Sequence, residues 1–121
     1  MTSRLSLFAF SALLVVCTIL AVTSTESLPE SVAIHFNAKN EADAWVSRDQ
    51  YRILVLLSLV GLPSLLIWVM AWLPRLTGGK GQIPDHEYWF ASERRVATEQ
   101  FLFAHACWLG AITVATIYGI H

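Results

Sequence analysis

Three stretches of the chain are almost entirely apolar, and the polar residues gather between them. The stretches run over residues 5–22, 53–73 and 101–120, and none of them contains Asp, Glu, Lys or Arg. An α-helix needs about 20 mostly apolar residues to cross the roughly 30 Å hydrocarbon core of a bilayer. Unbroken runs of this length are typical of helices, because the strands of membrane barrels alternate apolar and polar positions. The pattern predicts three transmembrane helices.

The predicted fold is an all-α integral membrane protein, a single domain over residues 1–121. Its three transmembrane helices are expected to form a small antiparallel bundle, with a structured extracytoplasmic loop over residues 23–52 and an inner loop over residues 74–100. Within the second apolar run, Pro63 has no N–H to donate and therefore predicts a kink.

The distribution of Lys and Arg predicts the orientation, since loops on the cytoplasmic side carry more of both. With the N-terminus inside, the inner side carries Arg4, Arg75, Lys80, Arg94 and Arg95, and the outer side carries Lys39, Arg48 and Arg52. We therefore expect a multi-pass protein of the cell (plasma) membrane with a cytoplasmic N-terminus and an extracytoplasmic C-terminus. Residues 1–24 can alternatively form a cleaved signal peptide, which would leave the orientation of the following residues unchanged.

The composition excludes several classes of function. Charged residues make up 14% of the chain, compared with about 25% in soluble globular proteins. Eight Lys and Arg stand against nine Asp and Glu, so there is no basic surplus to neutralise nucleic-acid phosphates. The expected partners are the lipid bilayer and another membrane protein or a second copy of the chain, with no nucleic acid.

The outer loop carries the main candidate site. Its candidate residues are His35, Phe36, Asn37, Asp43 and Trp45. Val32, Ile34 and Phe36 alternate with smaller or polar residues, which predicts an extended hairpin arm. A histidine near loop carboxylates could form a metal or acid–base site, but metal sites need three or four ligands. A structural cap over the helices is favoured, and recognition of an extracytoplasmic partner is the next reading.

A second candidate is His105, an ionisable side chain inside a predicted span. Such residues suggest proton or ligand handling, although a hydrogen bond to a neighbouring helix explains this one equally well. Cys17 and Cys107 lie at different depths of the predicted bundle and are expected to be buried free thiols. The sequence contains no nucleophile–base pair and no ligand cluster, so we expect a non-enzymatic protein with no catalytic residues, cofactor or metal.

The inner loop contains two features with structural consequences. Gly78, Gly79 and Gly81 indicate a flexible hinge, and Asp85 is placed to cap a short helix. Trp89 and Arg94 could form a cytoplasmic docking surface, although an interfacial turn leading into the third span explains them as well.

The outer loop resembles a known family in a specific series of residues. The series is Leu28, Pro29, His35, Phe36, Asn37, Asp43, Trp45 and Ser47. In this order the chain resembles the small membrane domain of unknown function (DUF1648 type) at the N-terminus of SdpI-like immunity proteins. Asn40 stands where that family usually has Gly, and asparagine is the next best residue at a left-handed position. The run from Tyr88 to Arg95 is similar to an element that follows the second helix in related proteins.

Two functions follow as expectations. The resemblance implies a small non-enzymatic membrane protein that binds a membrane or extracytoplasmic partner. The alternative is an accessory subunit of a transporter or membrane enzyme complex, in which His35 or His105 contributes to a shared site.

Overall fold

The computed structural model describes residues 3–121, and these residues are mostly helical. In chain order the elements are helix α1 (Ser3–Thr25), strands β1 (Ser31–Phe36) and β2 (Ala42–Ser47), helix α2 (Arg48–Ile67), the π-helical turn η1 (Trp68–Trp72), and helices α3 (Leu73–Thr77), α4 (His86–Trp89) and α5 (Arg95–Ile120). The two strands form a small antiparallel sheet. The predicted all-α class therefore describes the helices but omits this sheet, which forms where unbroken apolar runs give way to alternation.

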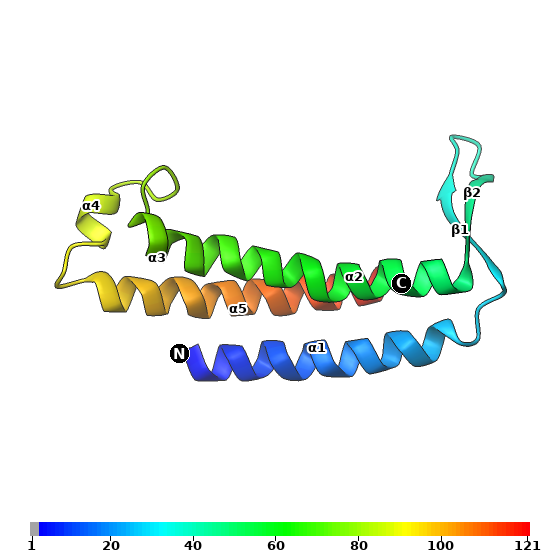
Figure 1. Cartoon of the computed structure of the whole chain (residues 1–121), viewed down its shortest axis with the longest axis horizontal. Helices are drawn as coiled ribbons and strands as arrows, with labels where there is room; N and C mark the ends of the chain where they lie inside the picture. Colours follow the sequence, from blue (N-terminus) through cyan, green and yellow to red (C-terminus); the bar gives the residue numbers. More distant parts are fainter. Residues whose placement is uncertain (1–2) are drawn as a thin grey trace.

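Helices α1, α2 and α5 lie along one another and form the body of the molecule (Figure 1). The chain follows α1 towards the hairpin, returns along α2 and runs back along α5. Leu59 of α2 and Cys107 and Val114 of α5 are fully buried between these helices. Gly110 lets α1 approach α5 closely, because a Cβ at this position would lie 3.0 Å from the ring of Phe10. Small residues of this kind allow helix backbones to pack tightly without water to drive them together.

The irregular part of the second long helix lies nearer its end than the sequence indicated. Helix α2 stays α-helical through Pro63, whereas η1 departs from α-helical hydrogen bonding. There the N–H of Leu73 donates to the carbonyl of Trp68, one residue further back than in an α-helix. The carbonyl of Val69, which this shift releases, accepts a hydrogen bond from Nε2 of Gln82 at 3.4 Å. A side chain of the following loop thus compensates for the change in backbone pairing.

The segment between α3 and α5 begins with a tight glycine turn. Gly78, Gly79 and Gly81 have φ values of 66°, 78° and 78°, which favour glycine. A Cβ on Gly79 would lie 2.9 Å from the ring of Phe90, so Gly79 also allows close packing, whereas Gly78 and Gly81 have open space around them. Asp85 precedes α4 but is left-handed and makes no side-chain cap hydrogen bond. The prediction that its side chain caps this helix is wrong, because a capping residue needs an extended backbone.

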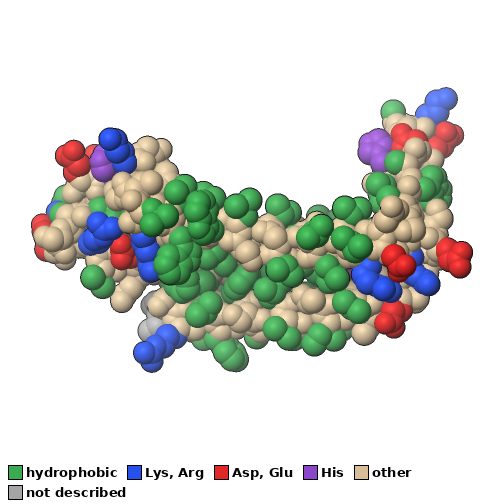
Figure 2. Space-filling view, viewed as in Figure 1, with side chains coloured by type: hydrophobic (Ala, Val, Ile, Leu, Met, Phe, Trp, Pro, Cys, Tyr) green, Lys and Arg blue, Asp and Glu red, His purple; other side chains and the backbone are tan. Residues whose placement is uncertain are grey.

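Three helical segments are long and apolar enough to cross a membrane: Ser3–Thr25, Arg48–Thr77 and Arg95–Ile120. They extend beyond the apolar runs because the helical backbone continues into polar residues at each end. At most 33% of the residues in their apolar windows are buried, so most of these side chains point outward. Figure 2 shows the charged side chains gathered at the two ends of the molecule, with an uncharged band between them.

Candidate functional site at the hairpin

The tip of the hairpin is closed by hydrogen bonds around Asn37. Its N–H donates to the carbonyl of Glu41 at 2.9 Å, and its Oδ1 accepts from the N–H groups of Lys39 and Glu41 at 2.9 and 3.0 Å. Asn40 has a φ of 61°, which confirms the prediction that an asparagine occupies a left-handed position here. Both asparagines therefore have structural roles in the turn.

His35 and Asp43 are two candidate residues whose side chains the fold joins by a hydrogen bond. Nδ1 of His35 donates to Oδ1 of Asp43 at 2.6 Å, and the two side chains are 67% and 42% exposed. Within residues 3–121, no group of three or more His, Cys, Asp or Glu side chains lies close enough to hold a metal ion. The pair supplies two ligands where a protein metal site needs three or four, and its evident role is to join the two strands.

Phe36, Trp45 and Ile34 are exposed apolar side chains of the hairpin, and we refer to them together as the apolar hairpin surface. Their exposed fractions are 53%, 58% and 45%. Phe36 lies opposite Ala42 and Trp45 lies opposite Ala33 in the strand register, so each large side chain faces a small one. Folding the hairpin leaves these three side chains largely uncovered.

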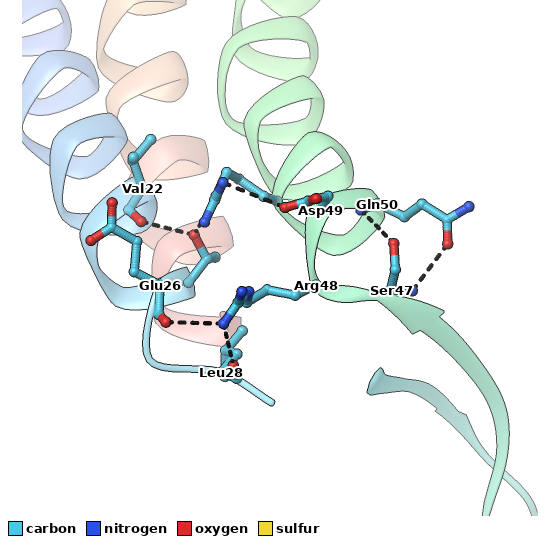
Figure 3. Close-up of polar contacts among 9 residues, drawn as sticks. Val22, Glu26, Leu28, Ser47, Arg48, Asp49 and Gln50 are labelled. Carbon is cyan, nitrogen blue, oxygen red and sulfur yellow. Dashed lines mark hydrogen bonds and ion pairs between the residues drawn. The ribbon is translucent and has the colours of Figure 1, made fainter. Parts of the chain in front are cut away.

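The base of the hairpin is fixed where β2 meets α2 (Figure 3). Oγ of Ser47 accepts from the N–H of Gln50 at 3.1 Å, and Oε1 of Gln50 accepts from the N–H of Ser47 at 3.0 Å. This reciprocal capping box satisfies two otherwise unpaired donors at the start of α2. Nη1 of Arg48 donates to the carbonyls of Glu26 at 3.3 Å and Leu28 at 3.1 Å. Arg48 thereby ties the segment that follows α1 to the first turn of α2.

A second arginine links the two helices themselves. Nε of Arg52 donates to Oγ1 of Thr25 at 3.0 Å, and the same hydroxyl donates to the carbonyl of Val22 at 2.8 Å. Thr25 is completely buried. Nη1 of Arg52 also lies 3.6 Å from Oδ1 of Asp49. The last turn of α1 is thus held against the start of α2 through a buried hydroxyl group.

The end of the chain joins the same region. Nε2 of His121 lies 2.6 Å from Oγ of Ser24, and its Nδ1 lies 2.9 Å from the hydroxyl of Tyr51. Oγ of Ser24 also donates to the carbonyl of Ala21 at 3.1 Å. One proton arrangement satisfies all these groups: Tyr51 donates to Nδ1, and Nε2–H donates to Ser24. Because the serine then accepts from the ring, this contact differs from a nucleophilic serine–histidine pair, in which the serine donates.

The opposite end of the bundle is held by ion pairs. Oε1 of Glu99 accepts from Nε of Arg95 at 3.0 Å, and its Oε2 lies 3.9 Å from Nε of Arg75. Nη2 of Arg95 donates to the carbonyl of Arg75 at 2.9 Å. The guanidinium of Arg75 lies 4.7 Å from the ring centroid of Trp72. These contacts tie α3 to the first turn of α5.

Arg94 is also occupied by contacts within the chain. Its Nε donates to the carbonyl of Tyr88 at 2.6 Å, and its guanidinium lies 3.8 Å over the ring of the same residue. Its Nη2 lies 3.3 Å from Oε1 of Glu93. A hydrogen bond from its own backbone amide, and then the charge of Arg94, lower the pKa of Glu93. Arg94 thus links Tyr88 and Glu93 within the inner loop.

His105 lies on the outward surface of α5, away from the hairpin residues. Its Nδ1 donates to the carbonyl of Phe101 at 2.9 Å, and the ring centroids of His105 and Phe101 are 4.0 Å apart. The bond lies within its own helix, so the predicted hydrogen bond to a neighbouring helix is wrong. Cys17 and Cys107 are buried free thiols, as predicted.

The residues that anchor the hairpin could not be identified as such from the sequence. Arg48 and Arg52 entered the prediction only through their charge, and His121 did not enter it. One available signal was the Ser47-x-x-Gln50 spacing, which is typical of a helix start. The acceptors for Arg48 are backbone carbonyls about twenty residues away, and backbone carbonyls leave no mark in a sequence.

Comparison with known proteins gives one family. Residues 12–62 match the family described as "Domain of unknown function (DUF1648)". The matched segment covers most of α1, the whole hairpin and α2 as far as Leu62, whereas the inner loop and α5 lie outside it. No curated protein and no solved structure matches the chain. The match over residues 12–62 supports the resemblance to the DUF1648 domain for the segment from α1 through the hairpin into α2.

Proposed function

We propose that this chain is a three-span protein of the cell membrane that binds an extracytoplasmic partner through the apolar hairpin surface. In this arrangement the helices form an antiparallel bundle with the N-terminus in the cytoplasm, and the hairpin and C-terminus lie outside. The uncharged band between two charged ends supports the membrane placement (Figure 2). The larger number of Lys and Arg at the end away from the hairpin supports the orientation.

The observation that carries the binding proposal is the contrast within the hairpin. Its tip and its base are held by hydrogen bonds, whereas Ile34, Phe36 and Trp45 remain about half exposed. Aromatic side chains on a rigid support lose little conformational entropy on binding and are enriched among residues that dominate interface energies. The hairpin also projects sideways from the helices (Figure 1), where a neighbouring protein in the same membrane can reach it.

The membrane placement is tested by extraction and labelling. The protein should stay with the membrane pellet after an alkaline wash. A cysteine introduced by His35→Cys, in a chain whose Cys17 and Cys107 are replaced by Ala, should react with a membrane-impermeant maleimide in intact cells. Ser92→Cys is the matched control and should react only after the cells are opened. The reverse labelling pattern would contradict the proposed orientation.

The binding role is tested by purifying the full chain from its native membrane in mild detergent. We expect a stoichiometric complex, with another membrane protein or a second copy, that is lost in a Phe36→Ser, Trp45→Ser double variant. Lys39→Ser is the matched control, because it changes an exposed hairpin residue outside the apolar surface. A complex that survives the double variant would refute recognition by this surface, and a large complex held through the helices would favour the accessory-subunit alternative.

A further inference from the structure

A groove lies at the end of the bundle away from the hairpin, between the start of α1 and the first turns of α5. Its volume is about 920 Å³, within the range of ligand sites in proteins. Arg4, Gln100 and His105 supply polar groups to its lining, and Phe101, Ala104 and Trp108 supply apolar ones. Neither the proposed function nor the DUF1648 match accounts for this combination, because α5 lies outside the matched segment.

The charge of the groove is positive. Arg4 is exposed, and its side chain has no hydrogen bond or ion pair within residues 3–121. Among residues 3–121, no Asp or Glu lines the groove. The nearest carboxylate along α5, Glu99, is engaged by Arg95 and Arg75. An anionic group in the groove would therefore meet a free guanidinium without a competing carboxylate.

His105 offers a second polar contact in the same groove. Because a carbonyl can only accept, Nδ1 of His105 carries the hydrogen that bonds to Phe101. This bond leaves Nε2 as the ring nitrogen with no partner within the described residues. The stacked Phe101 ring and the Nδ1 bond fix the orientation of the imidazole.

Trp108 is the deepest of the α5 residues that line the groove. Gln100 lies in the second turn of α5, and Trp108 lies eight residues deeper, about 12 Å at 1.5 Å per residue. The deepest part of the groove is therefore apolar, whereas polar and apolar side chains both line it nearer the end of the bundle. A phospholipid likewise becomes apolar from its headgroup to its acyl chains.

We infer that this groove binds an anionic phospholipid of the inner leaflet, with the phosphate beside Arg4 and His105 and an acyl chain along Ala104 and Trp108. The inference rests on the proposed membrane placement and orientation. Basic pockets between transmembrane helices on the cytoplasmic side bind anionic headgroups in this way. A small soluble anion would leave the apolar half of the groove unused, and a protein helix would leave Arg4 without a counter-charge.

The test compares phosphatidylglycerol with phosphatidylcholine of the same acyl chains by native mass spectrometry of the purified full chain in detergent. The wild-type protein should retain phosphatidylglycerol at least fivefold better. In Arg4→Gln the preference should fall about fivefold, since a basic side chain near an anionic surface contributes about 1 kcal/mol. Lys39→Gln, which removes a cation from the hairpin, should keep the preference.

A second variant tests the contribution of the groove's shape independently of the charge of Arg4. Ala97 is exposed and lines the groove, so Ala97→Trp should fill it and reduce retention of both lipids while every charge stays in place. Val96→Trp, at an exposed neighbour that does not line the groove, should have no effect. Glycerol 3-phosphate should not displace the lipid, and displacement would refute an acyl-chain site.

Equal retention of the two lipids by the wild-type protein would overturn the inference, as would a preference that survives both Arg4→Gln and Ala97→Trp. These results would leave the membrane placement intact if the protein still resists alkaline extraction and shows the expected labelling. Loss of the protein from the membrane pellet would instead refute the proposed function on which the inference rests.

Discussion

The two ends of the helix bundle are both held by arginines, but the arginines bind different kinds of acceptor. At the hairpin end, Arg48 and Arg52 donate to neutral groups, namely two backbone carbonyls and the buried hydroxyl of Thr25. At the opposite end, Arg95 donates to the carboxylate of Glu99 and to the carbonyl of Arg75, and Arg75 lies 3.9 Å from the same carboxylate. The hydrogen bonds of the arginines at the hairpin end thus go to neutral groups, with one longer contact between Arg52 and Asp49, whereas the opposite end combines a carbonyl acceptor with a shared carboxylate.

This difference predicts different energies at the two ends. A hydrogen bond from a charged donor contributes about 1.5–3 kcal/mol, and its loss leaves the acceptor unpaired. Partly exposed ion pairs contribute about 0–1 kcal/mol because water and salt screen them. The hairpin end should therefore tolerate substitution less well, although both ends contain arginines.

The largest effect is expected for Arg48→Met, which keeps the apolar stem and removes the guanidinium. The carbonyls of Glu26 and Leu28 lose their donor, so the free energy of unfolding should fall by about 2–3 kcal/mol. Circular dichroism during unfolding in mixed detergent micelles measures this change. Arg48→Lys should lose less, because an ammonium can still donate to both carbonyls.

Lys39→Met is the control for that variant. Its side chain is exposed at the hairpin tip, and the hydrogen bond of Lys39 to Asn37 uses the backbone. A loss in Arg48→Met no larger than in this control would show that the hairpin base does not depend on the guanidinium.

A smaller loss of about 1–2 kcal/mol is expected for Thr25→Val, which has nearly the same shape but no hydroxyl. Nε of Arg52 loses its acceptor, and the last turn of α1 loses a donor to Val22. Thr25→Ser keeps the hydroxyl and should retain most of the stability apart from the lost methyl group. If Val and Ser have the same effect in the same unfolding measurement, the hydroxyl does not link the helices.

The contrast between the ends also explains which parts of the structure the sequence could predict. The long apolar runs predict the three helices, because an α-helix satisfies all the backbone hydrogen bonds of a membrane-spanning segment within the segment itself. The alternation at Val32, Ile34 and Phe36 likewise predicted β1, and Asn40 marked the turn. These signals are local, so neighbouring residues are sufficient to reveal them.

The anchoring contacts depend instead on groups that are distant in the sequence or have no side chain. Arg48 binds carbonyls that precede the hairpin, and His121 meets Ser24 and Tyr51 only once all three long helices are packed. The turn η1 depends on a carbonyl that Gln82 reaches from the next loop. Long-range pairing of this kind cannot be inferred from residue type. The sequence therefore identified His35 and Asn37 as candidates but missed the arginines beneath them.

At the opposite end, Glu99→Gln should lower the free energy of unfolding by less than about 1 kcal/mol. The loss should nearly vanish in 1 M salt, where the screening length is about 3 Å, whereas the effect of Arg48→Met should remain. Glu87→Gln is the control, because Glu87 has no ion pair within residues 3–121. The two ends would not differ in kind if salt changed both effects equally.

The smallest effect concerns Glu93, in the inner loop beside Arg94. Its pKa is lowered first by a hydrogen bond from its own backbone amide and then by the charge of Arg94. A lowered pKa in the folded state means that the ionised carboxylate stabilises the native protein above the unfolded pKa. This contribution is lost as the pH falls through the folded pKa.

In an NMR titration of the carboxyl carbon of Glu93, Arg94→Gln should raise the pKa only partly, because the backbone hydrogen bond remains. Full return to the ordinary value of about 4.3 would show that charge attraction alone lowers the pKa, as expected of an ion pair in solvent. Because the side chain of Glu93 is largely exposed, the unfolding curve of Arg94→Gln should show almost none of the pH dependence that the titration detects.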